Sequence, residues 1–239
     1  GGYVITGQYH AQHPDILILK IDGQGNLENK YIISTAPPSQ RIIENGKSIL
    51  TLNDNYIILG SISQSSTNGP SNIWLSEYDV SLSGVGDTLW SKKWNLDTYD
   101  VPEKIIQTSD GSFAFAGYSL NNSGELEFSW IINTDNNGNE LSSIILTGSC
   151  YIYDFFENID GNYIVAGKKL IGDVFKGWII CLDFQGNQIW ENTYGNEEGA
   201  VFQSVKQTSD GGYILTGEGQ MNGITSILHV KTDPNGNIN

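Results

Sequence analysis

The stretch QTSDGGYILTG, Gln207–Gly217, decides the fold, because nearly the same eleven residues stand one hundred positions earlier as QTSDGSFAFAG, Gln107–Gly117. The Asp-Gly pair in both is a strong signal for a tight β-hairpin turn. The aromatic residue and the closing glycine recur in five segments. These are GGYVITG (1–7), DNYIILG (54–60), GSFAFAG (111–117), GNYIVAG (161–167) and GGYILTG (211–217). The closing glycines are Gly7, Gly60, Gly117, Gly167 and Gly217, and an interval of about 50 residues is typical of solenoids and propellers.

A second apolar segment follows each copy and ends in aspartate. The copies are DILILKID (15–22), NIWLSEYD (72–79), SWIINTD (129–135), GWIICLD (177–183) and SILHVKTD (226–233). Apolar and polar residues alternate in them, which predicts a strand with one better-buried face. The buried register holds Leu17, Trp74, Trp130, Trp178 and Leu228. A D-x-x-G-N frame follows four of the five copies, as at Asp183 and Gly186, and suits a short hairpin loop.

The repeating unit has four strands, because one further strand precedes the aromatic-glycine segment and another follows the hairpin loop. Four short antiparallel strands cannot bury both faces of their sheet alone. Packing such sheets face to face around an axis buries them. The sequence therefore predicts a single all-β domain over 1–239, a five-bladed β-propeller with four-stranded antiparallel blades. The approximate units are 1–35, 36–96, 97–147, 148–196 and 197–239.

The two terminal units look incomplete. The first opens on its second strand and the fifth ends after its last hairpin loop, so about eighteen strands are expected where a full ring has about twenty. Two explanations stay open: a five-bladed ring with two incomplete sheets, or a stretch of a longer repeat protein. We favour the first.

Composition limits the partners. The formal net charge is −15, and such a surface repels nucleic acid and anionic lipid. No apolar run is long enough to span a bilayer. No cofactor is expected, and no metal site is identifiable, although an acidic surface can attract Ca²⁺. Cys150 and Cys181 are expected to be free structural thiols, with one disulfide as the alternative.

The two repeated segments resemble a known family. SDGGYILTG (209–217) and GWIICLDFQGNQIWENTYG (177–195) are similar to the β-propeller repeats of secreted and surface proteins of bacteria and archaea. The first three units depart from that pattern; Trp190, for example, corresponds to Asn29 and Ser142. The resemblance implies a propeller and an extracellular or cell-surface address. It implies no reaction, because its motif residues are turn glycines and packing aromatics.

Function must be sought in sites. In a propeller, the long loops after the second and fourth strands of each unit share one face, here called the loop face; the tight turns share the other, the turn face. Loops that vary while turns repeat indicate a binding face. The candidate ligand-binding residues there are Tyr9, His10, Tyr99, Asp100, Tyr151, Tyr153 and Glu197.

No catalytic motif is recognisable in the chain. Glu103, Asp154 and Glu157 fall on innermost strands, and glycoside hydrolysis needs two such carboxyl groups. We predict a non-catalytic extracellular interaction or scaffold module with a protein or glycan partner at the cell surface. The first alternative is a carbohydrate-binding, lectin-like propeller, and the second is a glycoside hydrolase-like propeller. Whether the chain is an enzyme stays open, with binding favoured.

Overall fold

The computed structural model describes residues 1–10, 14–34, 42–53, 55–63, 70–79 and 87–238. Eighteen strands in this part of the chain form five consecutive antiparallel units, here called blades. A single parallel pair, Ser71 with Tyr99, joins the second and third blades into one eight-stranded sheet. Blade 1 holds β1 (Gly2–His10), β2 (Pro14–Asp22) and β3 (Leu27–Ile33). Blade 2 holds β4 (Ile43–Leu52), β5 (Asn55–Ser63), β6 (Ser71–Asp79) and β7 (Asp87–Trp94). Blade 3 holds β8 (Tyr99–Gln107), β9 (Phe113–Leu120), β10 (Leu126–Thr134) and β11 (Glu140–Leu146).

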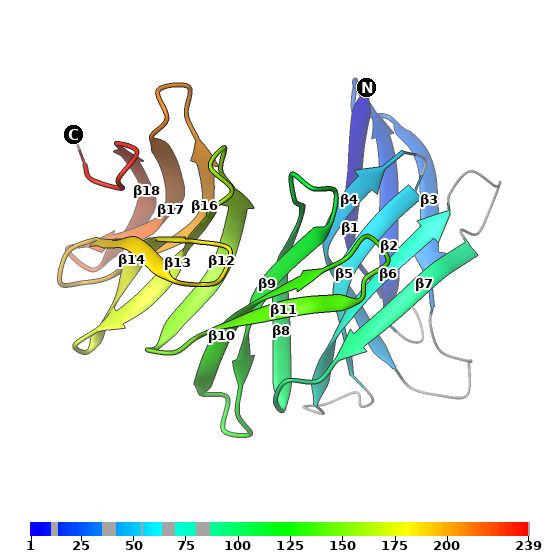
Figure 1. Cartoon of the computed structure of the whole chain (residues 1–239), viewed down its shortest axis with the longest axis horizontal. Coiled ribbons are helices and arrows are strands. Elements are labelled where there is room, and N and C mark those ends of the chain that lie inside the picture. Colours follow the sequence, from blue (N-terminus) through cyan, green and yellow to red (C-terminus); the bar gives the residue numbers. More distant parts are fainter. Residues whose placement is uncertain (11–13, 35–41, 54, 64–69, 80–86, 239) are drawn as a thin grey trace.

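Blade 4 holds β12 (Cys150–Glu157), β13 (Tyr163–Ile171), β14 (Val174–Leu182) and β15 (Gln188–Tyr194). Blade 5 holds β16 (Ala200–Gln207), β17 (Tyr213–Met221) and β18 (Ile224–Thr232). Blades 1 and 2 lie at the right of Figure 1, blade 3 in the centre, and blades 4 and 5 at the left. The all-β, five-bladed prediction is thus confirmed, including the two three-stranded terminal blades. No helix in the described part of the chain is long and apolar enough to cross a membrane.

The hairpin loops form as their residues predict. In the fourth unit, one carboxylate oxygen of Asp183 accepts the backbone N–H groups of Gln185 at 3.0 Å and Asn187 at 2.8 Å. Gly186 has a φ of 88°, a conformation that glycine adopts at little cost. The Asn187 side-chain amide also donates to Asp183, and this hydrogen bond is the main cause that lowers the pKa of the Asp183 carboxyl.

The core consists of four apolar clusters among the described residues, each between two consecutive blades. Trp74, Trp130 and Trp178 are the largest side chains in it and are at most 1% exposed. They stand at one register of β6, β10 and β14. Inter-blade packing therefore holds the fold together, since a single sheet of this size cannot bury its own faces.

The innermost strands of blades 2 to 5 share an irregularity. β4, β8, β12 and β16 each shift register against the next strand at one point, a β-bulge. The residues that fall at the shift are Lys47, Glu103, Tyr153 and Gln203.

The bulges explain the closing glycines. A Cβ atom added at Gly60, Gly117, Gly167 or Gly217 would collide with a backbone carbonyl oxygen of the adjoining innermost strand. Those carbonyls belong to Asn45, Val101, Tyr151 and Val201, each two residues before the bulge. A Cβ at Gly7 would meet nothing within 4 Å.

Candidate functional site

The four residues at the bulges differ in chemistry: they are a lysine, a glutamate, a tyrosine and a glutamine. A bulge changes the direction of the side chain that it carries. Lys47 Nζ lies 4.0 Å from Glu103 Oε2. Burial raises the pKa of the Glu103 carboxyl, and the nearby Lys47 ammonium and Tyr118 hydroxyl partly offset that rise. Glu103 is therefore a largely buried acid paired with a lysine of the neighbouring blade.

The residue after each bulge links its blade to a neighbour. Ser48 Oγ accepts the backbone N–H of Ile105 at 3.3 Å. Lys104 Nζ lies 3.4 Å from Asp154 Oδ1. The other oxygen of Asp154 accepts the Ser204 hydroxyl at 2.8 Å and the Val205 N–H at 3.0 Å. These contacts connect blades 2 to 5 in sequence, and they occupy Asp154.

An aromatic cluster surrounds one lysine on the loop-face side of blade 4. Lys168 Nζ lies 4.4 Å from the ring centroid of Tyr151, 4.5 Å from that of Phe175 and 5.9 Å from that of Tyr153. Such cation–π contacts stabilise a partly desolvated ammonium. Burial lowers the pKa of Lys168. Tyr118 packs edge-on against Tyr151 at 5.0 Å and Tyr153 at 6.2 Å between centroids.

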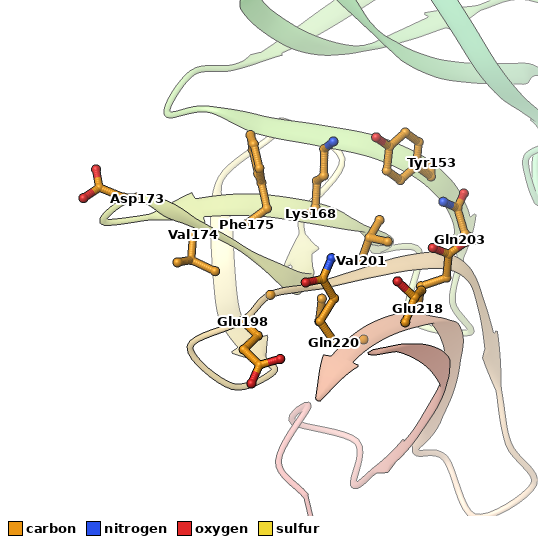
Figure 2. A pocket seen from close by; sticks show the side chains of 14 residues that line it. Tyr153, Lys168, Asp173, Val174, Phe175, Glu198, Val201, Gln203, Glu218 and Gln220 are labelled. Atoms are coloured by element: carbon orange, nitrogen blue, oxygen red, sulfur yellow. The ribbon is translucent and has the colours of Figure 1, made fainter. Parts of the chain in front are cut away.

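Beside this cluster lies a cavity of about 440 Å³ between blades 4 and 5, here called the loop-face pocket (Figure 2). Tyr153, Lys168 and Phe175 line it from blade 4, and Gln203 and Glu218 line it from blade 5. The remaining labelled residues are Asp173, Val174, Glu198, Val201 and Gln220. The pocket thus has aromatic walls, two side-chain amides, three carboxylates and one ammonium, a mixture suited to binding a ligand by shape and hydrogen bonds.

Glu198 shapes this pocket. Its carboxylate accepts the backbone N–H groups of Asn222 at 2.9 Å and Gly223 at 2.8 Å, at the tip of the β17–β18 hairpin. The loop that precedes blade 5 therefore holds that hairpin in place over the pocket.

The structure brings together two of the seven predicted ligand-binding residues, Tyr151 and Tyr153. Tyr153 lines the loop-face pocket, and Tyr151 packs on Lys168 behind it. Glu197 is exposed, beside the pocket residue Glu198.

The other four lie elsewhere. Tyr9 is half-buried in β1, with Lys30 Nζ 4.4 Å from its ring centroid, and His10 is exposed at the end of that strand. Tyr99 is half-buried at the start of β8. Asp100 is fully buried and accepts the Ser119 hydroxyl at 2.6 Å, together with the N–H groups of Leu96 and Asp97. Burial raises the pKa of its carboxyl. Asp100 is therefore a structural residue, which fixes the loop before β8 through these hydrogen bonds.

The sequence reasoning missed Lys168 and Glu218, although a signal for both exists. They occupy the position directly after the closing glycine, where the five units carry Gln8, Ser61, Tyr118, Lys168 and Glu218. The residue type at that position differs in every unit, whereas the glycine before it is the same in all five. Variation beside a fixed structural residue is what a site grafted on a repeat produces.

Two further pockets recur on the turn face at equivalent places. One of about 450 Å³ lies between blades 3 and 4, and one of about 350 Å³ lies between blades 4 and 5. Corresponding lining residues are Thr108 and Asn158, Asp110 and Asp160, Leu141 and Ile189, and Phe184 and Pro234. We call them the paired turn-face pockets.

The three carboxylates considered for hydrolysis have partners within the protein. Glu103 pairs with Lys47, and Asp154 is held as described above. Glu157 accepts the Ser109 N–H at 2.6 Å and its hydroxyl at 2.9 Å. Within the described residues, no group of three or more His, Cys, Asp or Glu side chains is placed to hold a metal ion. Cys150 and Cys181 are both buried free thiols, and burial raises the pKa of each to about 11.

Comparison with known proteins yields a fold and no sequence family. No protein-family model matches the chain, and no curated protein does. A GH43 β-1,3-galactosidase superposes with a TM-score of 0.55 at 9% identity, covering 94% of this chain and 52% of the galactosidase. The chain has the fold of the five-bladed propellers.

Two other structures are similar. The GH43 endo-arabinanase from Bacillus licheniformis gives a TM-score of 0.50 at 13% identity, over 99% of this chain and 92% of its own. A protein of unknown function from Bacteroides caccae gives 0.45 at 13% identity, over 98% and 90%. Identities this low speak for the fold alone, and function must come from the residues of this chain.

Proposed function

We propose that this protein is a non-catalytic interaction module of a secreted or surface protein, and that a protein partner binds at its loop-face pocket. The observation that carries the proposal is the pocket itself, where Tyr153, Phe175 and the ring-covered Lys168 face Gln203 and Glu218. The resemblance to propeller repeats of secreted and surface proteins supports the extracellular address.

Exposed apolar side chains lie within two positions in sequence of residues that line the pocket. Ile171 ends β13 at a hairpin tip of blade 4, and Met221 and Ile224 flank the equivalent tip of blade 5. Met221 is 63% exposed and Ile224 is 66% exposed. Exposed apolar groups at the hairpin tips next to a polar recess favour a protein-binding surface, in which a central anchor is surrounded by contacts that exclude water.

The charge of the pocket indicates the chemistry of the partner. Asp173, Glu198 and Glu218 bring three carboxylates, and the one lysine is covered by aromatic rings. The whole chain carries −15, so a basic partner would also be steered towards it. We infer a partner segment with a lysine or arginine as the anchor and apolar residues on both sides.

A peptide-display selection on the purified chain tests this proposal. We expect enriched peptides to carry one basic residue between apolar residues, and E218Q to weaken their binding at least about tenfold, since one charge-assisted contact is worth about 1.5–3 kcal/mol and each 1.4 kcal/mol is a factor of about ten. E127Q, on an exposed position of β10 in blade 3, is the matched control and should bind as the unchanged protein does. Selection that enriches no common motif, or equal binding by both variants, would contradict the proposal.

The lectin alternative has support of its own in the paired turn-face pockets. Repeated sites at equivalent places suit a repeated ligand such as a glycan, and these pockets combine side-chain hydroxyls, carboxylates and amides with exposed apolar groups. Phe184, 65% exposed, offers a ring on which a sugar could stack.

A glycan array separates this alternative from the first. A lectin should give signals for a defined set of glycans, and F184A should weaken them several-fold by removing one stacking surface. V174A, in the loop-face pocket, should leave them unchanged. An array without signals would count against the lectin and leave the peptide experiment unaffected. Hydrolysis has no comparable support, because Glu103 and Asp154 are engaged with lysines and neither lines the loop-face pocket.

A further inference from the structure

Three aromatic rings of blade 4, here called the aromatic box, surround one cation beside the loop-face pocket. Tyr151 and Tyr153 lie on β12, with ring centroids 6.3 Å apart and an angle of 21° between the ring planes. Phe175 on β14 stands edge-on to Tyr151, with centroids 5.7 Å apart and 73° between the planes. The ammonium of Lys168 lies within about 6 Å of all three centroids, the range in which a ring face attracts a cation.

A fourth ring supports the aromatic box from the neighbouring blade. Tyr118 of β9 packs edge-on against Tyr151 and Tyr153, and its hydroxyl is hydrogen-bonded to the Glu103 carboxyl on the innermost strand of blade 3. Two blades therefore position the rings. A site whose groups are already in place loses less free energy to ordering when a ligand binds.

Lys168 is poorly matched to the aromatic box. An ammonium group carries three N–H donors, whereas ring faces attract the charge without supplying ordinary hydrogen-bond acceptors. Among the residues that the structure describes, none forms an ion pair or a hydrogen bond with Lys168 Nζ, and its contacts are with the rings. Burial lowers the pKa of Lys168, so these surroundings stabilise the charged form less well than water does.

A quaternary ammonium group suits such a box better than a primary one. It carries a full positive charge and no N–H donor, so it leaves no hydrogen bond unmade when it enters a site built of rings. Recognition of quaternary ammonium ligands, including methylated lysine, is the main functional use of cation–π attraction. The residues of the aromatic box therefore favour a methylated ammonium over a free one.

The loop-face pocket can receive the ammonium that such a ligand would displace. Figure 2 shows Lys168 between Phe175 and Tyr153, with the pocket beside them. The lysine side chain is long and flexible, and the pocket contains three carboxylates that could accept its hydrogen bonds. These carboxylates also disfavour a phosphocholine headgroup, because its phosphate would lie close to their charges. A trimethylated lysine has only an aliphatic chain next to its cation.

We propose that the aromatic box binds a quaternary ammonium group in place of Lys168, and that its ligand is a trimethylated lysine of the protein partner. The inference rests on the proposed binding of a protein at the loop-face pocket, and it specifies the basic anchor of that partner. Lys168 is then an internal competitor, whose ammonium must leave the rings before the ligand can enter.

Nuclear magnetic resonance titration of the whole chain tests this with three probes: N-acetyl-trimethyllysine amide, N-acetyl-lysine amide and phosphocholine. We expect the trimethylated probe to bind at least about tenfold more tightly than the other two. Its methyl proton resonance should move upfield, because ring faces shield the methyl groups that lie over them. Equal affinity for the two lysine probes, or binding without the upfield shift, would overturn the proposal. Tighter binding of phosphocholine would also overturn it, by making a lipid headgroup the ligand.

Three variants locate the binding. K168Q removes the competing cation and should bind the trimethylated probe several-fold more tightly than the unchanged chain. F175L removes one ring, keeps an apolar side chain and should bind it several-fold more weakly. V174A, in the pocket but outside the aromatic box, is the matched control and should bind it as before. Affinity that K168Q and F175L both leave unchanged would contradict the proposal.

The melting temperature of each variant shows whether it is folded. Should F175L not fold, K168Q and the shift of the methyl resonance still decide, since neither depends on removing a ring. The failure of this inference can be distinguished from that of the proposed function. If the trimethylated probe does not bind, while selected peptides bind and E218Q weakens them, the aromatic box is not the anchor site and the loop-face pocket remains the proposed binding site.

Discussion

Replacing Trp178 with alanine is expected to lower the free energy of unfolding by about 3–5 kcal/mol, the usual cost of truncating a buried tryptophan. Trp178 is 1% exposed and lies in the apolar cluster between blades 3 and 4. Its indole N–H donates to the Glu191 carboxylate, which also pairs with Lys169. Truncation would leave a cavity between two rigid sheets and would remove one partner of a half-buried carboxylate.

Urea denaturation of the purified chain, followed by far-ultraviolet circular dichroism, measures this effect. F184A is the matched control, because Phe184 is an aromatic residue that is 65% exposed in the same blade. Its loss should stay within about 0.5 kcal/mol, as for most surface substitutions. A cost below about 1 kcal/mol for Trp178→Ala would mean that inter-blade packing is not the main source of stability.

Strands and hairpins could be predicted from the sequence because their causes are local. Alternation at Trp178 and its neighbours gives a strand, and Asp183 with Gly186 gives the turn that follows it. Repetition then supplies the long-range part, since identical sheets that cannot bury their faces must pack on one another. This is why the five-bladed architecture followed from the residues without any family match.

The bulges could not be predicted from alternation. A bulge changes the hydrogen-bond register, and the side-chain pattern of an innermost strand such as β12 does not display that change. The signal lay one strand away, in the closing glycine that the bulge requires. Gln203 therefore reads as an ordinary strand residue in the sequence, and Tyr153 could be predicted only as an aromatic residue near the loop face, although both stand at a bulge and line the loop-face pocket.

Asp100 shows why residue type alone does not identify a binding site. An aspartate in a variable loop can face a ligand or satisfy backbone donors of its own loop, and the two cases look alike in sequence. Here the buried carboxylate of Asp100 accepts the backbone N–H groups of Leu96 and Asp97, so it is not available to a ligand. Only the fold of the loop distinguishes these outcomes.

Replacing Asp154 with alanine is expected to have the second largest effect, a loss of about 3 kcal/mol in the free energy of unfolding. Asp154 is 4% exposed and connects three blades, through Lys104 of blade 3 and through Ser204 and Val205 of blade 5. Alanine would leave the buried Val205 N–H without its acceptor and the Lys104 ammonium without its counter-charge. The cost should fall at the lower end of the range for broken buried ion pairs, because the Lys104 side chain is 33% exposed and can reach water.

Asp154→Asn separates the two contributions, because an amide oxygen can still accept the Val205 N–H while the ion pair is lost. We expect Asp154→Asn to lie between the unchanged chain and Asp154→Ala in urea denaturation, and D173A, an exposed carboxylate of the same blade, to change stability by less than about 0.5 kcal/mol. If Asp154→Asn and Asp154→Ala lose equal stability, the charge carries the whole effect and the hydrogen bond to blade 5 contributes nothing. If Asp154→Ala is as stable as the unchanged chain, the polar contacts among the innermost strands do not hold the blades together. Packing around the three tryptophans would then have to account for the cohesion of the propeller alone.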